Sequence, residues 1–179
     1  MADDGKLIGS AQILPDELVR IISGTTYSYT PLAGDQWYYR LTNVPILSPV
    51  DLIKIGDSYL QGSTTAAGTD AASSAPVIAS GDVVKFLFIK NTGYEDNGTT
   101  VITGSVYLSL NASTTGDLAE IAVADNDIIE IGPGESLALK INCIVDDLHC
   151  EAGTPGFVTQ ALTTSKKVQC IVAAVLDDV

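Results

Sequence analysis

Two short fragments together contain the residue types of a nucleophilic catalyst. They are Gly56-Asp57-Ser58 and Asp146-Asp147-Leu148-His149. A serine hydroxyl becomes a nucleophile when a positioned histidine takes its proton and an acid orients that histidine. Ser58, His149 and Asp146 are the candidates for these three tasks. The alternative interpretation is a turn at Gly56 and a polar loop at Asp146, which needs no catalysis.

The Gly-Asp-Ser fragment resembles the opening of one family of lipases and esterases, in which Asp-x-x-His supplies the other two catalytic residues. That family has an α/β fold with its serine near the start of the chain. Between Ser58 and Asp146 this sequence has β-patterned runs and turns without helical crossovers. We therefore predict that the protein is not an enzyme and keep a serine hydrolase as an alternative.

Zinc and calcium are the metals that the side chains suggest. Four residues with zinc-binding side chains occur in the second half of the chain: Cys143, His149, Cys150 and Cys170. There is no C-x-x-C pair, and the adjacent residues His149 and Cys150 would point to opposite faces of a strand. Three cysteines without framework spacing favour free buried thiols, and His149 is expected in a loop. Glu95-Asp96-Asn97 and Asp125-Asn126-Asp127 lack EF-hand spacing and are expected to be turns. No cofactor or metal is expected.

Aromatic residues near the N-terminus suggest either sugar stacking or packing. Trp37, Tyr38 and Tyr39 follow Tyr27 and Tyr29. Adjacent strand positions alternate between faces, so only some of these rings can line one surface. Tyr and Trp are enriched at protein interfaces, and we favour core or subunit interface over a glycan site.

Gly132-Pro133-Gly134-Glu135 resembles the Pro-Gly-Glu turn of cupins. Cupin enzymes bind their metal with several histidines, whereas this chain has one His. The turn chemistry nevertheless predicts a hairpin between Ile128–Ile131 and Ser136–Val145.

The elements that must position these residues are mostly strands. No segment has the pattern of a long amphipathic helix, and residues 15–22 suit one short helix because Pro15 and the acids after it precede Gly24. Gln61 to Ser80 is expected to be a surface loop. Alternating or apolar β-branched runs bounded by turn residues predict strands at Thr25–Tyr29, Trp37–Thr42, Val83–Lys90, Thr100–Leu110, Ala119–Val123, Ile128–Ile131, Ser136–Val145 and Val168–Val175.

This pattern predicts an all-β fold, a β-sandwich or jelly-roll-like domain with an extended N-terminal arm and at most one short helix. The expected domains are residues 1–26, an arm with the short helix, and residues 27–179, a single β-sandwich. A chain of 179 residues is long enough to bury its own core.

Charge and composition restrict the partners. The chain has nine Lys plus Arg against 22 Asp plus Glu, a net charge of −13, which disfavours direct nucleic-acid binding. Its start is acidic where a secretory signal would be basic, and no apolar run is long enough to span a membrane. We expect synthesis in a cytoplasm.

Six segments, in order along most of the chain, resemble small virion structural proteins of tailed bacteriophages, especially of marine cyanobacterial phages. They are Leu7–Pro31, Trp37–Pro45, Lys85–Gly93, Val106–Asn111, Ile129–Ile141 and Lys167–Asp178. The resemblance implies a capsid decoration, or cement, protein on the outside of the head. It implies the major capsid protein as partner and a homotrimer as the oligomer, made in the bacterial host. A head-fibre or tail-associated module that binds a receptor or glycan is the alternative.

Contacts with neighbouring subunits are expected at the arm and at two aromatic residues. The arm contains the apolar residues Leu7, Ile8, Ile13 and Leu14, which have few local partners. They should pack on a neighbouring subunit or on the main sandwich. Trp37 and Tyr39 are the other interface candidates. Because main-chain pairing makes few demands on sequence, the arm could also add a strand to a neighbour's sheet.

Overall fold

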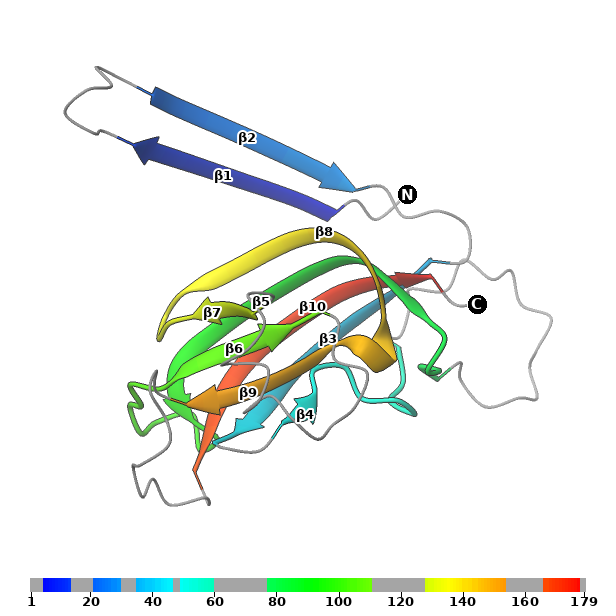
Figure 1. Ribbon diagram of the computed structural model, residues 1–179, viewed down its shortest axis with the longest axis vertical. Coiled ribbons are helices and arrows are strands. Elements are labelled where there is room, and N and C mark those ends of the chain that lie inside the picture. Colours follow the sequence, from blue (N-terminus) through cyan, green and yellow to red (C-terminus); the bar gives the residue numbers. More distant parts are fainter. Residues whose placement is uncertain are drawn as a thin grey trace. The chain divides into compact units, whose positions relative to one another are not determined.

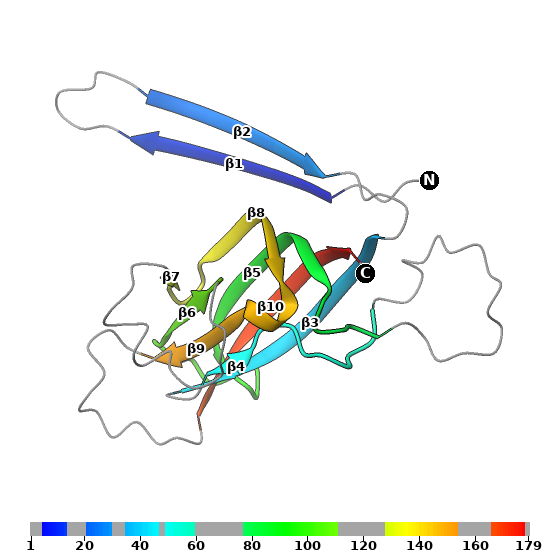
Figure 2. The same ribbon diagram turned by 45° about the vertical axis from the view of Figure 1, so that its right-hand side comes forward.

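The computed structural model forms two compact units, Met1–Ala33 and Gly34–Val179. The structure describes residues 5–13, 21–29, 35–46, 49–59, 77–110, 128–153 and 166–177. Figures 1 and 2 show the strands of both units. Within the described residues there is one helical segment, the 3-10 helix η1 (Val145–Asp147), and no helix that could cross a bilayer.

The N-terminal unit is a β-hairpin. Strand β1 (Gly5–Ile13) pairs antiparallel with β2 (Ile21–Tyr29), from Gly5 opposite Tyr29 to Ile13 opposite Ile21. Within the expected arm, residues 1–26, the segment Gly5–Ile13 is therefore a paired strand. The helix expected at residues 15–22 is wrong at its last two residues, which begin β2, and residues 14–20 lie outside the described part. The unit ends at Ala33, whereas the expected boundary after residue 26 falls inside β2.

The larger unit is a β-sandwich of two antiparallel sheets, which confirms the predicted all-β class. The long-strand sheet has the order β3-β10-β5-β8, formed by Asp35–Pro45, Lys167–Asp177, Val83–Glu95 and Ser136–Ile144. The short-strand sheet has the order β4-β9-β6-β7, formed by Val50–Asp51, His149–Gly153, Ser105–Ser109 and Ile128–Ile131. The predicted strand Ala119–Val123 lies outside the described residues.

Strand pairing in the sandwich is nested. β3 pairs with β10, β4 with β9, β5 with β8, and β6 with β7. The first of the eight strands thus pairs with the last, the second with the one before it, and so on inward. Two further pairings, β10 with β5 and β9 with β6, complete the two sheets.

The hairpin predicted between Ile128–Ile131 and Ser136–Val145 is wrong. β7 pairs with β6 in the short-strand sheet, whereas β8 pairs with β5 in the long-strand sheet. The turn closes on itself, since the Glu135 amide donates to the Gly132 carbonyl at 3.0 Å. It then docks on β5, where the Gly134 amide donates to the Asn91 carbonyl at 2.9 Å and the Asn91 amide donates to the Glu135 carbonyl at 3.0 Å. These bonds hold the turn on β5, at the point where the chain passes from the short-strand sheet to the long-strand sheet.

The core lies between the sheets and follows strand alternation. Alternate residues of the central strands β10 and β6 are fully buried there, among them Val172, Ala174, Val106 and Leu108. Ile78, at the end of the expected surface loop, is also buried at 1% exposure, so that expectation is wrong there; residues 60–76 lie outside the described part. Burial of a large aliphatic side chain contributes about 1.5–3 kcal/mol.

Candidate functional site

The outer face of the short-strand sheet is polar. Cross-strand register places Asp51, His149 and Ser109 in one row and Glu151, Tyr107 and Glu130 in the next. Their sequence neighbours, such as Leu108 and Cys150, belong to the core. Because side chains alternate along a strand, the six polar residues share the opposite face. With Ser105 they form what we call the polar face.

His149 is the most buried ionisable side chain of the polar face. It is 2% exposed, and its Nε2 lies 3.2 Å from Oδ1 of Asp51 on β4. Its Nδ1 is buried and has no hydrogen-bond partner among the described residues. The prediction of a loop histidine is wrong, because His149 begins β9. Asp51, the cross-strand partner of His149, therefore contacts one of the two ring nitrogens, Nε2.

The row Asp51, His149 and Ser109 has the residue types of a catalytic triad but not its geometry. In a triad one imidazole nitrogen binds the acid and the other accepts the serine proton. Here Nε2 faces Asp51, and no hydrogen bond joins Nδ1 to Ser109 or to any other described residue. Ser109 is only 2% exposed, so its hydroxyl is out of reach of a substrate carbonyl in this conformation.

The triad suggested by sequence is not brought together. Ser58 is exposed and forms an isolated bridge with Val77, and Asp146 lies in η1. The turn expected at Gly56 is confirmed, with φ +86 and a 3.1 Å bond from the Asp57 amide to the Lys54 carbonyl. The Asp57 carboxylate accepts from Arg40 and lies 3.5 Å from the Tyr38 hydroxyl, which ties this turn to β3.

Two carboxylates flank Tyr107 on the polar face. Ser105 donates from its hydroxyl to Glu130 Oε1 at 2.6 Å, and the Tyr107 hydroxyl donates to the same oxygen at 3.4 Å. Burial, and then the charge of Glu130, raise the pKa of Tyr107 to about 12. Burial also raises the pKa of Glu151. These contacts join neighbouring strands, so the face stabilises the sheet whatever else it does.

The candidate zinc ligands are split between the core and the opposite face of the short-strand sheet. Cys143, Cys150 and Cys170 are free and buried in the core. His149 and Cys150 are successive residues of β9, so they point to opposite faces, as the sequence indicated. Burial raises the pKa of Cys143 to about 11 and that of Cys170 to about 12. Across the described ranges, His, Cys, Asp and Glu side chains form no group of three that could hold a metal.

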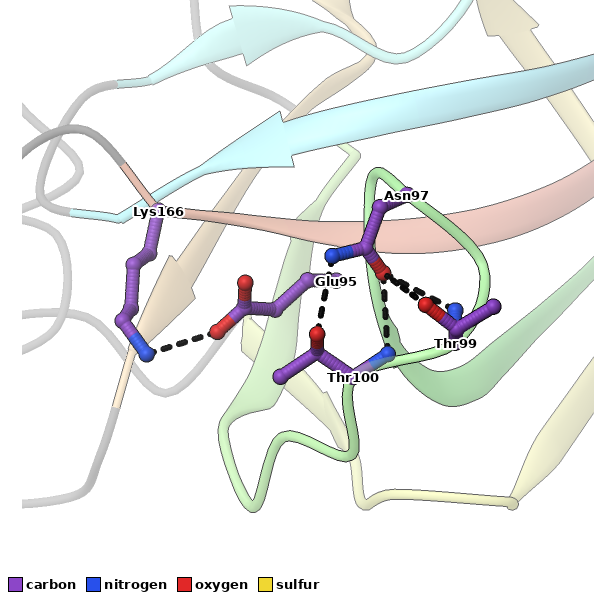
Figure 3. A network of polar contacts seen from close by, with 5 residues as sticks. All are labelled: Glu95, Asn97, Thr99, Thr100 and Lys166. Carbon is purple, nitrogen blue, oxygen red and sulfur yellow. Dashed lines mark hydrogen bonds and ion pairs between the residues drawn. The ribbon is translucent and has the colours of Figure 1, made fainter.

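In the acidic stretch Glu95-Asp96-Asn97, Glu95 ends β5 and the expected turn begins at Asp96. Oδ1 of Asn97 accepts from the amides of Thr99 and Thr100, each at 2.9 Å, and its Nδ2 donates to the Thr100 hydroxyl at 2.8 Å (Figure 3). Glu95 is bound by Lys166 Nζ at 2.6 Å. The stretch is thus stabilised by its own hydrogen bonds. Asp125-Asn126-Asp127 lies outside the described residues.

The outer face of the long-strand sheet has an apolar area, bordered by Lys90 opposite Ile171 and by Lys140 opposite Phe86. Trp37, Tyr39 and Leu41 alternate along β3, with Tyr38 pointing to the core at 2% exposure. Cross-strand register extends the same face over β10 and β5. We call it the apolar face: Trp37, Tyr39, Leu41, Ile171, Ala173, Val175, Phe86 and Phe88.

The predicted interface residues divide between the two units. Tyr39 is 55% exposed and lies on the apolar face with Trp37. Leu7, Ile8 and Ile13 are all in β1, and Leu14 lies outside the described residues.

Sequence reasoning missed six members of the polar face: Asp51, Ser105, Tyr107, Ser109, Glu130 and Glu151. The signal for it was present in Ser105-Val106-Tyr107-Leu108-Ser109, where polar and apolar residues alternate. Cross-strand partners such as Asp51 and His149 are far apart in sequence, and their pairing appears only in the fold. Comparisons with protein-family models, curated proteins and solved structures found no match to this chain.

Proposed function

We propose that this chain is a virion structural protein of a tailed phage that decorates the outside of the head and stabilises its lattice. The N-terminal hairpin carries this proposal, because it forms a unit separate from the sandwich. A two-stranded hairpin is at best marginally stable alone in water. It therefore needs a surface to pack on, as expected of an assembly arm.

The strands of the hairpin pair several apolar residues with one another. Leu7 is the cross-strand partner of Tyr27, and Ile13 is the partner of Ile21. Apolar pairs in a separate two-stranded hairpin support binding to another protein surface.

The nested pairing of the sandwich supports a jelly roll, as proposed from sequence. A jelly roll has eight strands in two sheets and occurs in viral capsid domains. The pairs β3·β10, β4·β9, β5·β8 and β6·β7 are those of one long antiparallel ribbon wound into two sheets. Fold alone does not specify function, so this support is by analogy.

Charge supports an exterior position. A net charge of −13 repels packaged DNA and suits a basic stripe on the major capsid protein. Charged residues make up only 17% of the chain, so much of its surface is available for close packing. Cement proteins act by burying surface across joints of the shell. These contacts must break before the shell ruptures.

A binding experiment tests the proposal. The full chain is added to purified heads that lack it, and occupancy and the temperature of DNA release are measured. We expect saturable binding and release at a higher temperature. A chain starting at Gly34, which lacks the hairpin but keeps the sandwich, should remain folded and bind much more weakly. Binding to a glycan array but not to heads would favour the receptor-binding alternative instead.

A further inference from the structure

We propose that Asn97 is a site of spontaneous deamidation that the folded turn keeps unreactive. Asn97-Gly98 is the one Asn-Gly pair in the sequence. Glycine has no Cβ, so its backbone nitrogen can approach a neighbouring side chain with little hindrance. This site bears on the chemical durability of the chain and does not depend on the decoration function.

The reaction needs only this pair of residues and water. The backbone nitrogen of Gly98 loses its proton to water or hydroxide and attacks Cγ of Asn97. The new N–Cγ bond closes a succinimide ring, the Cγ–Nδ2 bond breaks, and the nitrogen of the former amide takes up a proton and leaves as ammonia. Water then opens the ring at either carbonyl to give aspartate or isoaspartate. Overall, water is consumed and ammonia is released.

The pair lies where solvent reaches it. Residues 96–100 form the exposed turn between Tyr94 and Val101, which are joined by an antiparallel bridge. Asn97 and Gly98 are both exposed. Burial therefore does not protect this pair, and any protection in the folded chain comes from the hydrogen bonds of the turn.

The attacking nitrogen is held by one of these hydrogen bonds. The Gly98 amide donates to the Glu95 carbonyl at 2.9 Å. Attack requires the loss of this same N–H proton, so the bond must break first. The φ of Gly98 is +68, a left-handed conformation that glycine adopts at little cost, and it places the amide in this bond.

The side chain under attack is held as well (Figure 3). Oδ1 of Asn97 accepts from the amides of Thr99 and Thr100 at 2.9 Å each, and from the Thr99 hydroxyl at 3.1 Å. Nδ2 donates to the Thr100 hydroxyl at 2.8 Å. Both ends of the carboxamide are thus bound to residues further along the turn. These bonds stabilise one position of the side chain and oppose its movement onto the Gly98 nitrogen.

The base of the turn is anchored to the sandwich. The Glu95 amide donates to the Thr100 carbonyl at 2.8 Å, and the Glu95 carboxylate binds Lys166 Nζ at 2.6 Å, next to the start of β10. Deamidation therefore requires a local opening that breaks several hydrogen bonds. Because each contributes to stability, the folded chain should react at least about tenfold more slowly than the unfolded chain.

Modification would in turn prevent the turn from closing. Isoaspartate routes the main chain through the Cβ atom and lengthens it. The bonds from the Glu95 amide to the Thr100 carbonyl and from the Gly98 amide to the Glu95 carbonyl then lose their register. Since the ion pair of Glu95 with Lys166 links this turn to β10, a modified chain should also have a weakened contact there.

Peptide mapping by mass spectrometry tests the protection. The full chain is incubated in mildly alkaline buffer, folded or in denaturant, and aspartate and isoaspartate at Asn97 are measured over time. We expect little modification in the folded chain and steady modification in denaturant. Asn142, exposed but followed by the bulkier Cys143, is the internal control and should react slowly in both states. Equal rates at Asn97 in the two states would overturn the proposal. So would a faster rate in the folded chain, which would mean that the amides bound to Oδ1 stabilise the oxyanion of the attack.

A matched pair of variants tests the role of the side-chain hydrogen bond. Thr100→Val removes the hydroxyl that binds Nδ2 of Asn97, so the folded chain should deamidate about two- to tenfold faster. Thr100→Ser keeps the hydroxyl and should react like wild type. In denaturant all three chains should react at the same rate, because these substitutions act on the folded turn. Equal rates of the three folded chains would contradict the assigned protection.

Discussion

The side-chain amide of Asn91 in the long-strand sheet donates a 3.1 Å hydrogen bond to the backbone carbonyl of Ile131 in the short-strand sheet. The same Nδ2 donates to the Gly104 carbonyl at 3.0 Å, and Oδ1 accepts from the Gly93 amide at 2.9 Å. Asn91 is 0% exposed. One buried side chain therefore satisfies backbone groups of both sheets at the end of the sandwich where the chain crosses between them.

Replacing Asn91 by alanine should be strongly destabilising. The change leaves the buried carbonyls of Gly104 and Ile131 without this donor, and an unsatisfied buried polar group costs about 1–3 kcal/mol. We expect Asn91→Ala to lower the free energy of unfolding by about 2–4 kcal/mol and the melting temperature by about 5–15 °C. Asn142→Ala is the control: Asn142 is exposed and should change stability by less than about 0.5 kcal/mol. Equal effects would contradict this account of Asn91.

Gly134 should resist substitution because of its backbone conformation. Its φ is +80, and a Cβ added there would meet nothing within 4 Å, so only the left-handed conformation opposes alanine. We expect Gly134→Ala to lower the free energy of unfolding by about 1–2 kcal/mol in denaturant titrations. At Gly81 a Cβ also has open space, and φ is not in the left-handed region. Gly81→Ala should therefore be neutral or slightly stabilising. Greater destabilisation by Gly81→Ala than by Gly134→Ala would refute the argument.

Glu151 should make stability depend on pH. Burial raises the folded-state pKa of Glu151, so the folded protein binds its proton more tightly than the unfolded chain does. This contribution to stability is complete below the unfolded pKa of about 4.3 and is lost as pH rises through the raised folded value. Relative to wild type, Glu151→Gln should gain stability as pH rises through this window. Asp96→Asn, on an exposed turn, controls for the loss of one charge. A difference in the free energy of unfolding between wild type and Glu151→Gln that does not change with pH would count against the prediction.

The three thiols should be protected in the native protein. Burial raises the pKa of Cys143 to about 11, that of Cys170 to about 12, and that of Cys150 well above its usual value. Because the thiolate is the reactive form, iodoacetamide at pH 8 should modify none of them quickly in the folded state and all three in denaturant. Mass spectrometry after timed labelling gives the rates. Rapid native labelling of Cys150, which is 0% exposed, would show that the core opens readily.

The sequence predicted the positions of strands better than it predicted which strands pair with one another. The Ile128–Ile131 strand was predicted with its observed bounds, because alternation and turn residues are local signals. The Gly132–Glu135 turn predicts a hairpin because it contains Gly and Pro, which are typical of tight turns. Its hydrogen bonds to Asn91, about forty residues away in sequence, carry the chain into the other sheet instead, and such distant pairing leaves no local pattern.

The candidate site likewise depends on contacts between residues that are far apart in the sequence. The spacing of Asp146 and His149 suggested a local pair, yet His149 faces Asp51 across two strands. Ile21 and Ile22 followed a good helix start signal but begin β2, where pairing with Ile13 and Gln12 outweighs local propensity. By contrast, the separation of His149 from Cys150 followed from strand alternation alone and was predicted correctly.

The most direct test of the decoration function is an electron cryo-microscopy map of the phage particle at a resolution that shows side chains. The account predicts density for this sandwich in trimers on the outer surface of the head lattice, with each N-terminal hairpin on a neighbouring subunit. Assignment of the chain to the tail, to the capsid interior or to no ordered position in the particle would contradict it.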